Sequence, residues 1–271
     1  MLLTAPAKIN LSLSVLGKRP DGFHDIESHF VTITLADTLT LEPASEFQFT
    51  CSDAALPYDD GNLAVRAARR FFETVRVTPA VRIHLEKKIP HGAGLGGGSS
   101  DAAAVLRGLN TLHGSPLAPE TLHALAAELG SDVPFFLAGG SALCRGRGEL
   151  IKPAPFPHRL PLLLVKPAFG VPTPWAYSRW RGSHETPQVF PWGTLVNDLE
   201  RPVFEKYLFL AVLKRWLLQQ PEIEGALMSG SGSTCFAVLR DGTQGPVLEA
   251  RAREEFGKVW TCLCETTLLR R

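Results

Sequence analysis

The chain has 271 residues, of which 45% are hydrophobic and 20% are charged. This balance excludes an intrinsically disordered chain, and the length is sufficient for one large domain or two modest ones. The formal net charge is +1, so no strong overall field draws the protein to nucleic acid or to an anionic membrane. An anionic ligand must therefore be held by a local site.

Five scattered cysteines argue against a secreted protein built on disulfides, because such frameworks are paired and denser. Cys262 and Cys264 alternate along an apparent strand, and we interpret them as buried or half-buried thiols rather than as part of a zinc site. The sequence has no apolar run of the roughly 18 residues that a membrane span needs, and no pattern of a targeting peptide at its start. We therefore expect a cytoplasmic protein without a membrane partner.

The first 90 residues favour antiparallel strands and one helix. Residues 7–16 alternate between apolar and polar side chains, and the Pro and Asp-Gly within 18–25 predict a turn. A helix is predicted over 62–75, with Asn62 as its N-cap. Further strands are predicted at 29–43, 46–52 and 81–90.

The rest of the chain mixes helices and strands around a candidate domain edge. Helices are predicted from Ser100 to Gly114 and over 119–129. The proline-rich stretch at 152–161 predicts a division into an N-terminal domain, residues 1–150, and a C-terminal domain, residues 151–271. In the second domain, strands are predicted at 160–165, 233–239 and 259–268, and helices at 197–220, interrupted at Pro202, and at 246–256.

The segment PHGAGLGGGSSD at 90–101 is the most informative in the chain. It contains five glycines, which permit positive φ angles and a close approach of the backbone to a ligand. Consecutive backbone N–H groups in such a loop can surround an anion, and a helix that begins directly afterwards adds the positive end of its dipole. The hydroxyls of Ser99 and Ser100 can donate to phosphate or bind a metal. The pattern predicts a phosphate-binding loop.

Three other interpretations of this loop fit less well. A flexible hinge would not need a strand, clustered glycines and a capped helix in that order. Gly92, Gly94 and Gly97 match the spacing of a dinucleotide-binding fingerprint, but residues 111–121 form a turn and more helix where that fold needs a strand. A Walker A loop is excluded because its Gly-Lys-Ser/Thr sequence is missing. A nucleoside triphosphate site of another type remains.

PHGAGLGGGSSDAAA resembles the phosphate-binding motif of the superfamily of galactokinase, homoserine kinase, mevalonate kinase and phosphomevalonate kinase. The segment at 6–28, PAKINLSLSVLGKRPDGFHDIES, resembles its N-terminal motif, and LMSGSGSTCFAVL at 227–239 resembles its C-terminal glycine motif. The three motifs occur in the order of that superfamily. The resemblance implies a two-domain α+β kinase fold, with an N-terminal domain like the ribosomal protein S5 domain 2-like fold and a ferredoxin-like α+β sandwich as the C-terminal domain.

Further segments narrow the resemblance. KRPDGFHDIES, ELGSDVPFFLAGGSALCRGRGE at 128–149 and NDLE at 197–200 are similar to the 4-diphosphocytidyl-2-C-methyl-D-erythritol kinase family. Membership would imply ATP and Mg²⁺ as cofactors. It would also imply transfer of the γ-phosphate to the 2-hydroxyl of the cytidine diphosphate-linked methylerythritol, in the non-mevalonate pathway to isoprenoid precursors.

The resemblance places the general base at Asp132 and its partner lysine at Lys8. The chemistry agrees, because an alcohol that attacks phosphorus must lose a proton, which a carboxylate can accept. A nearby ammonium keeps such a carboxylate ionised and stabilises negative charge. From the residues alone, Asp132 is equally well explained as a helix-end or turn residue, whereas Lys8 is unusual on a strand of alternating apolar side chains.

The resemblance also assigns nucleotide-binding residues. Asn62, Lys87 and Asp101 align with the nucleotide side of the site, and Asp101 replaces an asparagine often found in the family. Ser99 and Ser100 are the candidate contacts to Mg²⁺ through MgATP, and no other metal ligand is predicted. The loop supplies the remaining nucleotide-binding residues, which are Pro90, Gly92, Gly94, Leu95, Gly96, Gly97 and Gly98.

The DGFHD turn resembles the cytosine-binding segment of the family. His24 would hydrogen-bond the edge of the base, and Phe23 would stack on its face, with Tyr177 opposite. Asn10 is also placed on the substrate side. Phe23 stands where the family commonly has tyrosine, so stacking is kept and a hydroxyl contact is lost. From the residues alone, Tyr177 is more simply an ordinary aromatic of the core or surface.

Two alternatives stay open on the sequence. One is another small-molecule kinase of the superfamily, of the homoserine or mevalonate type, whose substrate has no base to stack. The other is a non-catalytic metabolite-binding protein with the same fold, against which the presence of Lys8 and Asp132 argues. The expected partner is a small molecule in either case, and no nucleic-acid partner is predicted.

Overall fold

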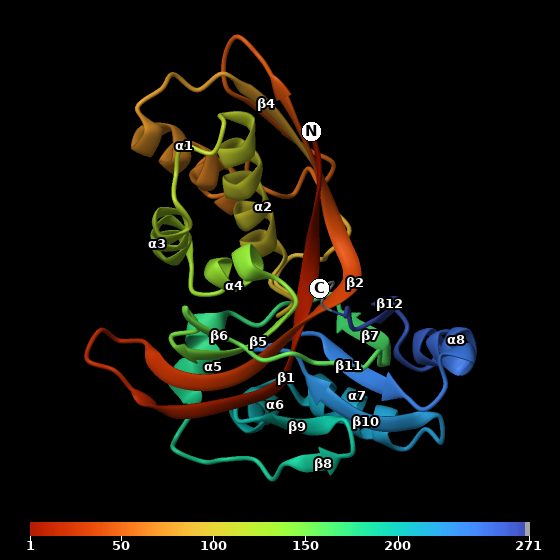
Figure 1. Cartoon of the computed structure of the whole chain (residues 1–271). Helices are drawn as coiled ribbons and strands as arrows, with labels where there is room; N and C mark the ends of the chain where they lie inside the picture. Colours follow the sequence, from red (N-terminus) through yellow and green to blue (C-terminus); the bar gives the residue numbers. More distant parts are fainter. Residues whose placement is uncertain (269–271) are drawn as a thin grey trace. The chain divides into compact units, whose positions relative to one another are not determined.

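The computed structural model describes residues 1–268. Its contacts divide the chain into two compact units, neither of which is continuous in sequence. The first unit comprises residues 1–7, 36–90 and 96–139, and the second comprises residues 8–35, 91–95 and those from 140 onward. The long strands β1 (Leu2–Lys18) and β2 (His24–Pro43) each contribute to both units (Figure 1). A single domain boundary at residue 150 therefore stays a prediction.

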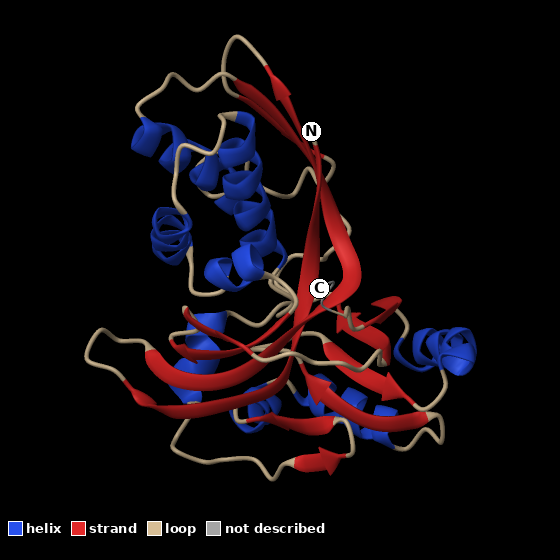
Figure 2. Ribbon diagram, viewed as in Figure 1, coloured by secondary structure: helices blue, strands red, loops and turns tan. Residues whose placement is uncertain are grey.

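The first unit combines strands with a group of four helices (Figure 2). Its β4 (Val81–Glu86) pairs antiparallel with β2 and parallel with β3 (Gln48–Cys51). In β4, alternate side chains are buried, as the period of two in its sequence predicts. The helices of this unit are α1 (Leu63–Val75), α2 (Gly97–Leu112), α3 (Pro119–Leu129) and α4 (Val133–Ala138).

Local sequence explains where α1 begins and how α2 packs. Asn62 caps α1 as predicted, because its Oδ1 accepts a hydrogen bond from the backbone N of Ala64 at 3.0 Å. In α2, Gly108 faces β1 and β2, where an added Cβ would lie 2.4 Å from the side chain of Leu3 and 2.9 Å from that of Leu41. The missing side chain at this position lets the helix pack directly against the strands.

The second unit contains a four-stranded antiparallel sheet in the order β10-β11-β7-β12. These strands are β7 (Pro161–Pro167), β10 (Ile223–Met228), β11 (Cys235–Leu239) and β12 (Val259–Glu265). Helix α7 (Leu208–Leu218) contacts β10 and β11, and α8 (Gly245–Phe256) contacts β12 and β7. The other elements are β5 (Ser141–Gly146), β6 (Leu150–Pro153), α5 (Thr173–Arg179), β8 (Gln188–Phe190), β9 (Gly193–Asn197), α6 (Glu200–Lys206) and a 3₁₀ turn (Gly242–Gln244).

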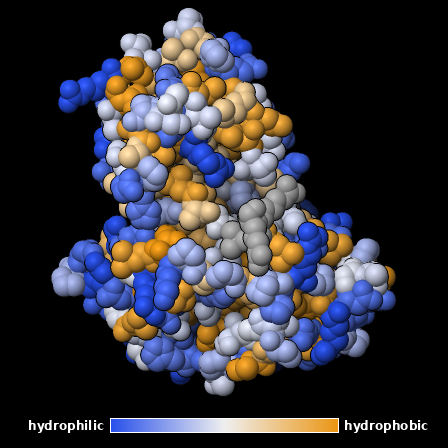
Figure 3. Space-filling view, viewed as in Figure 1, coloured by the Kyte–Doolittle hydropathy of each residue, from blue (hydrophilic) through white to orange (hydrophobic). Residues whose placement is uncertain are grey.

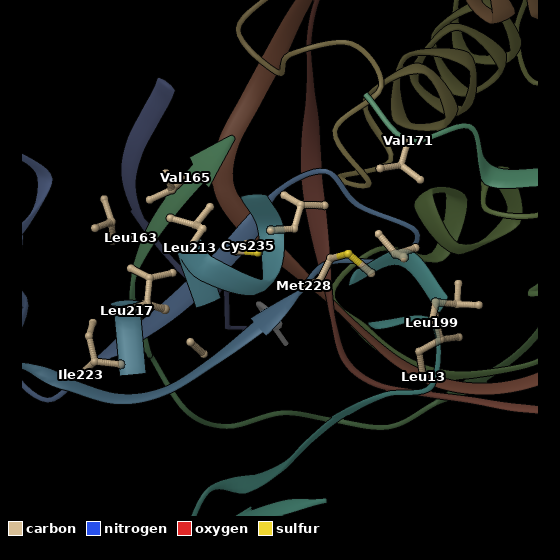
Figure 4. Close-up of a cluster of buried hydrophobic side chains, with 14 of the residues drawn as sticks. Leu13, Leu163, Val165, Val171, Leu199, Leu213, Leu217, Ile223, Met228 and Cys235 are labelled. Atoms are coloured by element: carbon tan, nitrogen blue, oxygen red, sulfur yellow. The ribbon is translucent and has the colours of Figure 1, made fainter. Parts of the chain in front are cut away.

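A buried apolar cluster joins this sheet to its helices and to β1 (Figure 4). The cluster includes Leu213 and Leu217 of α7, Val165 of β7 and Cys235 of β11. Each of these side chains is fully buried, so the cluster stabilises the second unit by removing apolar surface from water. The buried position of Cys235 also raises the pKa of its thiol.

Two sequence-based boundaries were wrong. The predicted helix over 197–220 is two helices, and the break falls at Tyr207 instead of Pro202. Pro202 lies in the first turn of α6, where a helix does not need its missing N–H group. The helix predicted from Ser100 begins three residues earlier, at Gly97, although glycine is a poor helix former.

Among residues 1–268, no helix is long and apolar enough to cross a membrane. All five cysteines in this part of the chain are free thiols, and Cys262 and Cys264 are half-buried on β12 as predicted. On the face drawn in Figure 3, hydrophilic and hydrophobic residues are interspersed.

Candidate active site

The backbone of the glycine-rich segment adopts the conformation that its glycines allow. Gly92, Gly94 and Gly96 have φ angles of 62°, 74° and 72°, in the left-handed region that other residues rarely occupy. The alternation of left-handed glycines with ordinary residues turns the chain sharply between β4 and α2. The region is therefore a defined loop of the kind that can present N–H groups to an anion.

Gly94 lies directly against the C-terminal glycine motif within the second unit. An added Cβ on Gly94 would lie 2.2 Å from the carbonyl oxygen of Ser229 and 2.9 Å from that of Gly232. The Oγ of Ser229 donates to the carbonyl oxygen of Gly94 at 2.9 Å, and the backbone N of Thr234 donates to that of Ala93 at 3.2 Å. Two glycine-rich motifs far apart in sequence thus form one packed structure.

The N-terminal motif, through Lys8 and Asn10, contacts the same two glycine-rich segments. The backbone N of Lys8 donates to the carbonyl oxygen of Leu95 at 2.9 Å. An added Cβ on Gly230 would lie 3.4 Å from the Oδ1 of Asn10 and 3.6 Å from the Nζ of Lys8. All three motifs singled out in the sequence therefore meet within the second unit, around Lys8, Leu95 and Gly230.

Lys8 is a buried cation with defined contacts. Its Nζ donates to the Oδ1 of Asn10 at 2.7 Å and lies 4.5 Å from the ring centre of Phe30. Asn10 in turn donates through its Nδ2 to the Oγ of Ser28 at 2.8 Å. This chain of contacts holds the ammonium in one place, as a group that acts on a developing negative charge requires.

Asp132 is the N-cap residue of α4, but its carboxylate makes no capping hydrogen bond to that helix. Asp132 thus lies at a helix end, a position that one of the explanations left open by the sequence expects. The side chain is half-buried, within reach of both solvent and protein groups. Lys8 belongs to the second unit and Asp132 to the first.

The first turn of α2 has the properties of an anion site. Its N-cap, Gly96, supplies no capping side chain, and the Oγ of Ser100 is buried without a hydrogen-bond partner among residues 1–268. The neighbouring Ser99 is half-buried. Buried hydroxyls are normally paired, so the unpaired Oγ of Ser100 points to a ligand such as a phosphate oxygen.

Lys87 and Asp101 form a buried ionic group with Asp37, a residue that the sequence did not single out. The Nζ of Lys87 donates to the Oδ2 of Asp101 at 2.8 Å and also to the Oδ2 of Asp37. Burial and the nearby Asp37 outweigh Lys87 and raise the pKa of Asp101 to about 7. The two carboxylates in turn outweigh burial and raise the pKa of Lys87.

The side-chain amide of Asn62 also makes hydrogen bonds within the protein. Besides capping α1, it donates through Nδ2 to the carbonyl oxygen of Pro57 at 3.1 Å. The polar atoms of Asn62 and the ammonium of Lys87 are therefore both engaged within the first unit, which gives each a structural role.

The residues expected to bind cytosine belong to an aromatic group in the second unit. The rings of His24 and Tyr177 lie 5.4 Å apart at an angle of 31°, and Trp180 meets His24 edge-on at 6.1 Å. Burial, assisted by the charge of Lys18, lowers the pKa of His24. His24 is therefore a neutral ring near pH 7, able to donate and to accept hydrogen bonds.

The ring of Phe23 is covered by the guanidinium group of Arg147. The guanidinium carbon of Arg147 lies 4.8 Å from the ring centre, and about half of Phe23 is exposed. Sequence reasoning missed Trp180 and Arg147. Their only signal was their place in aromatic and basic segments close to matched motifs.

Two residues of the NDLE segment, Asn197 and Glu200, form hydrogen bonds with the backbone of the C-terminal glycine motif. The Nδ2 of Asn197 donates to the carbonyl oxygens of Met228 at 2.7 Å and Gly230 at 2.8 Å. Glu200 accepts from the backbone N of Met228 at 2.9 Å and pairs with Lys214. Although Lys214 opposes the effect, burial raises the pKa of Glu200. Both side chains fix the backbone that lies beside Lys8 and Asn10.

The loop and the first turn of α2 have features that fit the phosphates of a nucleotide. The left-handed glycines and the unpaired Ser100 hydroxyl suit phosphate oxygens. Within residues 1–268, no group of three or more His, Cys, Asp or Glu side chains is placed to hold a metal ion.

Comparison with known proteins identifies both parts of the chain. Residues 62–140 match the family model of the N-terminal domain of GHMP kinases, and residues 191–258 match that of the C-terminal domain. A 4-diphosphocytidyl-2-C-methyl-D-erythritol kinase of Methylacidiphilum infernorum is 45% identical over 244 residues, covering 87% of this chain and 85% of the relative. Another from Gloeobacter violaceus is 40% identical over 261 residues, covering 88% and 85%.

Solved structures agree. The crystal structure of a 4-(cytidine 5'-diphospho)-2C-methyl-D-erythritol kinase matches with a TM-score of 0.79 and 38% identity, covering 98% of this chain and 100% of that one. A homoserine kinase of Cytophaga hutchinsonii matches with a TM-score of 0.69 over 99% of this chain and 94% of its own, and at 19% identity it shows the fold alone. The predicted two-domain α+β fold is confirmed. The chain belongs to the GHMP kinase family and, within it, to the family of 4-diphosphocytidyl-2-C-methyl-D-erythritol kinases.

Proposed function

We propose that this chain transfers the γ-phosphate of ATP to the 2-hydroxyl of 4-diphosphocytidyl-2-C-methyl-D-erythritol, giving the 2-phosphate and ADP in the non-mevalonate pathway to isoprenoid precursors. The observation that carries the proposal is the 45% identity to a kinase named for this substrate, over 87% of the chain. The meeting of the three motifs around Lys8, Leu95 and Gly230 supports a phosphoryl-transfer site.

Asp132 is the proposed general base and Lys8 the proposed catalytic cation. Asp132 takes the proton from the 2-hydroxyl as that oxygen attacks phosphorus, and Lys8 stabilises the negative charge that develops. The contacts of Lys8 with Asn10 and Phe30 support this role, because they hold the ammonium before the substrate arrives. Most of the catalysis would then come from positioning and electrostatics.

ATP is proposed to lie along the glycine-rich loop, with its phosphates against the N–H groups from Gly92 to Ser100. Mg²⁺ bound with ATP would neutralise charge on the phosphates, and Ser99 and Ser100 are the proposed protein residues that would hold it. Asn62, Lys87 and Asp101 are proposed to line the nucleotide side. Because their polar groups are mostly engaged with protein partners, we expect them to shape the site.

The cytidine end of the substrate is proposed to bind at Phe23, His24 and Tyr177. A neutral His24 can hydrogen-bond the edge of cytosine, and the two other rings offer stacking surfaces. Phe23, with Arg147 over its ring, supports the base without the hydroxyl of the usual tyrosine. We further propose that the protein acts in the cytoplasm, where free thiols such as those observed persist.

The test is ADP release with MgATP in parallel reactions on 4-diphosphocytidyl-2-C-methyl-D-erythritol, mevalonate and homoserine. Turnover on the cytidyl substrate alone supports the proposal. Turnover on mevalonate or homoserine keeps the kinase and rejects the role of His24 and Tyr177 in base recognition. Absence of turnover on all three rejects the proposed reaction.

A further inference from the structure

A single buried carboxylate holds the chain at the entrance of the glycine-rich loop. Asp37, on β2, is fully buried in the first unit. Its Oδ1 accepts hydrogen bonds from the backbone N of Lys88 at 2.6 Å and of Ile89 at 2.8 Å, the two residues just before Pro90. Its Oδ2 accepts from the Nζ of Lys87. Asp37 thus receives three donors from three consecutive residues.

The same group also fixes the chain where the loop ends. The Nζ of Lys87, held by Asp37, donates to the Oδ2 of Asp101 in α2 at 2.8 Å. Gly97, the first residue of α2, packs on the chain held by Asp37. An added Cβ there would lie 2.9 Å from the Cγ2 of Ile89 and 3.3 Å from the Nζ of Lys87. Both ends of the segment from Pro90 to Gly96 are therefore tied to one buried side chain.

We propose that Asp37 is a positioning residue for nucleotide binding, which fixes the entry and exit of the glycine-rich loop so that its N–H groups are arranged before phosphate arrives. The inference rests on the proposed function, in which this loop binds the ATP phosphates. A loop whose ends are fixed loses less conformational freedom when it binds, so that more of the interaction energy appears as affinity.

Stability alone does not explain the group. Burying two carboxylates and an ammonium costs desolvation energy, and apolar side chains of similar volume often stabilise a protein as well or better. Unlike apolar packing, the charged group fixes the positions of particular atoms, because each oxygen of Asp37 accepts hydrogen bonds from defined donors. We therefore expect its loss to affect phosphate binding more than it affects folding.

Asparagine cannot take the place of Asp37, although it has the same shape. If its Oδ1 faces the backbone N–H groups of Lys88 and Ile89, its Nδ2 meets the ammonium of Lys87, donor against donor. If the amide is reversed, the Nδ2 faces the two backbone N–H groups instead. In either orientation, Asp37→Asn therefore loses the hydrogen bonds of one side-chain oxygen, either those from Lys88 and Ile89 or the one from Lys87.

The experiment compares Asp37→Asn with Asn110→Asp. Asn110 is buried in the same unit and bridges the backbone N and O of Leu117, away from the loop. Each variant exchanges an amide and a carboxylate in a buried network, so both should lower the melting temperature. We measure the Kd of MgATP by calorimetry and the KM values of MgATP and of the cytidyl substrate.

For Asp37→Asn we expect the Kd and KM of MgATP to rise about tenfold or more, as the loss of a charge-assisted hydrogen bond implies. The KM of the cytidyl substrate should stay near that of the wild type, and Asn110→Asp should bind MgATP normally. An Asp37→Asn protein that melts earlier but keeps the Kd of MgATP would overturn the inference. Because calorimetry needs no turnover, the inference can be judged even if the proposed substrate is wrong.

Amide hydrogen exchange of the wild-type protein provides a second measurement if Asp37→Asn does not fold. The amides of Lys88 and Ile89 should be strongly protected without nucleotide, and MgATP should add protection mainly from Gly92 to Gly98. Rapid exchange of Lys88 and Ile89 in the free protein would also overturn the inference, because their hydrogen bonds to Asp37 would then not be stably formed before the nucleotide binds.

Discussion

The hydroxyl of Ser229 donates to the carbonyl oxygen of Gly94 at 2.9 Å, joining two loops that are 135 residues apart in sequence. The approach is so close that Gly94 has no room for a side chain. Through this contact, the C-terminal glycine motif holds the backbone of the proposed phosphate-binding loop at Gly94.

Gly94→Ala should impair both folding and nucleotide binding. The added methyl group would overlap the carbonyl of Ser229, in addition to the strain of alanine at a φ of 74°. We expect a loss of about 2–4 kcal/mol in the free energy of unfolding and a raised KM for MgATP. Urea denaturation and initial rates measure the two effects.

Gly114→Ala is the matched control. Gly114 has a φ of 75°, but an added Cβ would meet no atom within 4 Å. It should therefore show only the backbone strain, about 1 kcal/mol, with an unchanged KM for MgATP. Equal effects of the two substitutions would contradict the importance of the contact with Ser229.

Asp101→Asn should change how stability depends on pH. The pKa of Asp101 is raised to about 7 in the folded protein, above the ordinary value of 3.8, mainly by burial. The folded state then binds the proton more tightly than the unfolded chain. The free energy of unfolding therefore falls as pH rises from the ordinary pKa to about 7.

Asparagine removes this penalty and can still accept a hydrogen bond from Lys87. Since one pKa unit corresponds to about 1.4 kcal/mol, we expect Asp101→Asn to be stabilised by about 1 kcal/mol or more at pH 8. The difference should shrink towards pH 4, where both proteins are neutral at this position. Denaturant titrations at pH 4 and pH 8 measure this difference in the free energy of unfolding. An Asp101→Asn protein less stable than the wild type at pH 8 would contradict the raised pKa of Asp101.

Tyr177→Ala should weaken binding of the cytidyl substrate specifically. Stacking of a base on an aromatic ring contributes about 1–3 kcal/mol, so the KM should rise by about 5- to 150-fold. The KM of MgATP should change little, and Tyr177→Phe, which keeps the ring, should behave like the wild type. An equal rise in both KM values would indicate a general disturbance of the aromatic group of His24 and Trp180.

Asp132→Asn should lower kcat by about 100- to 10,000-fold, the usual contribution of a general base. The Kd of MgATP should not change, because the proposed role of Asp132 concerns the alcohol. Ser131→Ala, at the neighbouring position, serves as the control and should retain its kcat. Normal turnover by Asp132→Asn would favour another base or none.

The local features of this protein could be predicted from its sequence. Asn62 caps α1 as its residue type indicates, and the clustered glycines around Gly94 correctly marked a specialised loop. These signals work because an N-cap or a left-handed residue depends on neighbours within a few positions. The three matched motifs also allowed the family to be predicted, and the fold followed from the family.

What the sequence did not reveal depends on contacts over long separations. Asp37 lies about 50 residues from Lys87, and nothing in its strand marks it as the partner of the loop. The start of α2 at Gly97 was missed because glycine propensity argues against a helix there, whereas packing on Ile89 requires glycine. The function of Asn197 likewise became visible only when its amide was seen to hold Met228 and Gly230.

Phosphorus NMR of the products tests the central claim most directly. The protein is incubated with MgATP and 4-diphosphocytidyl-2-C-methyl-D-erythritol, and the reaction is followed to completion. The account predicts ADP and a new phosphate monoester on the 2-hydroxyl, with the cytidine diphosphate resonances retained and a much slower appearance of the same product with Asp132→Asn. ADP with inorganic phosphate alone, or a phosphate on another hydroxyl, would contradict it.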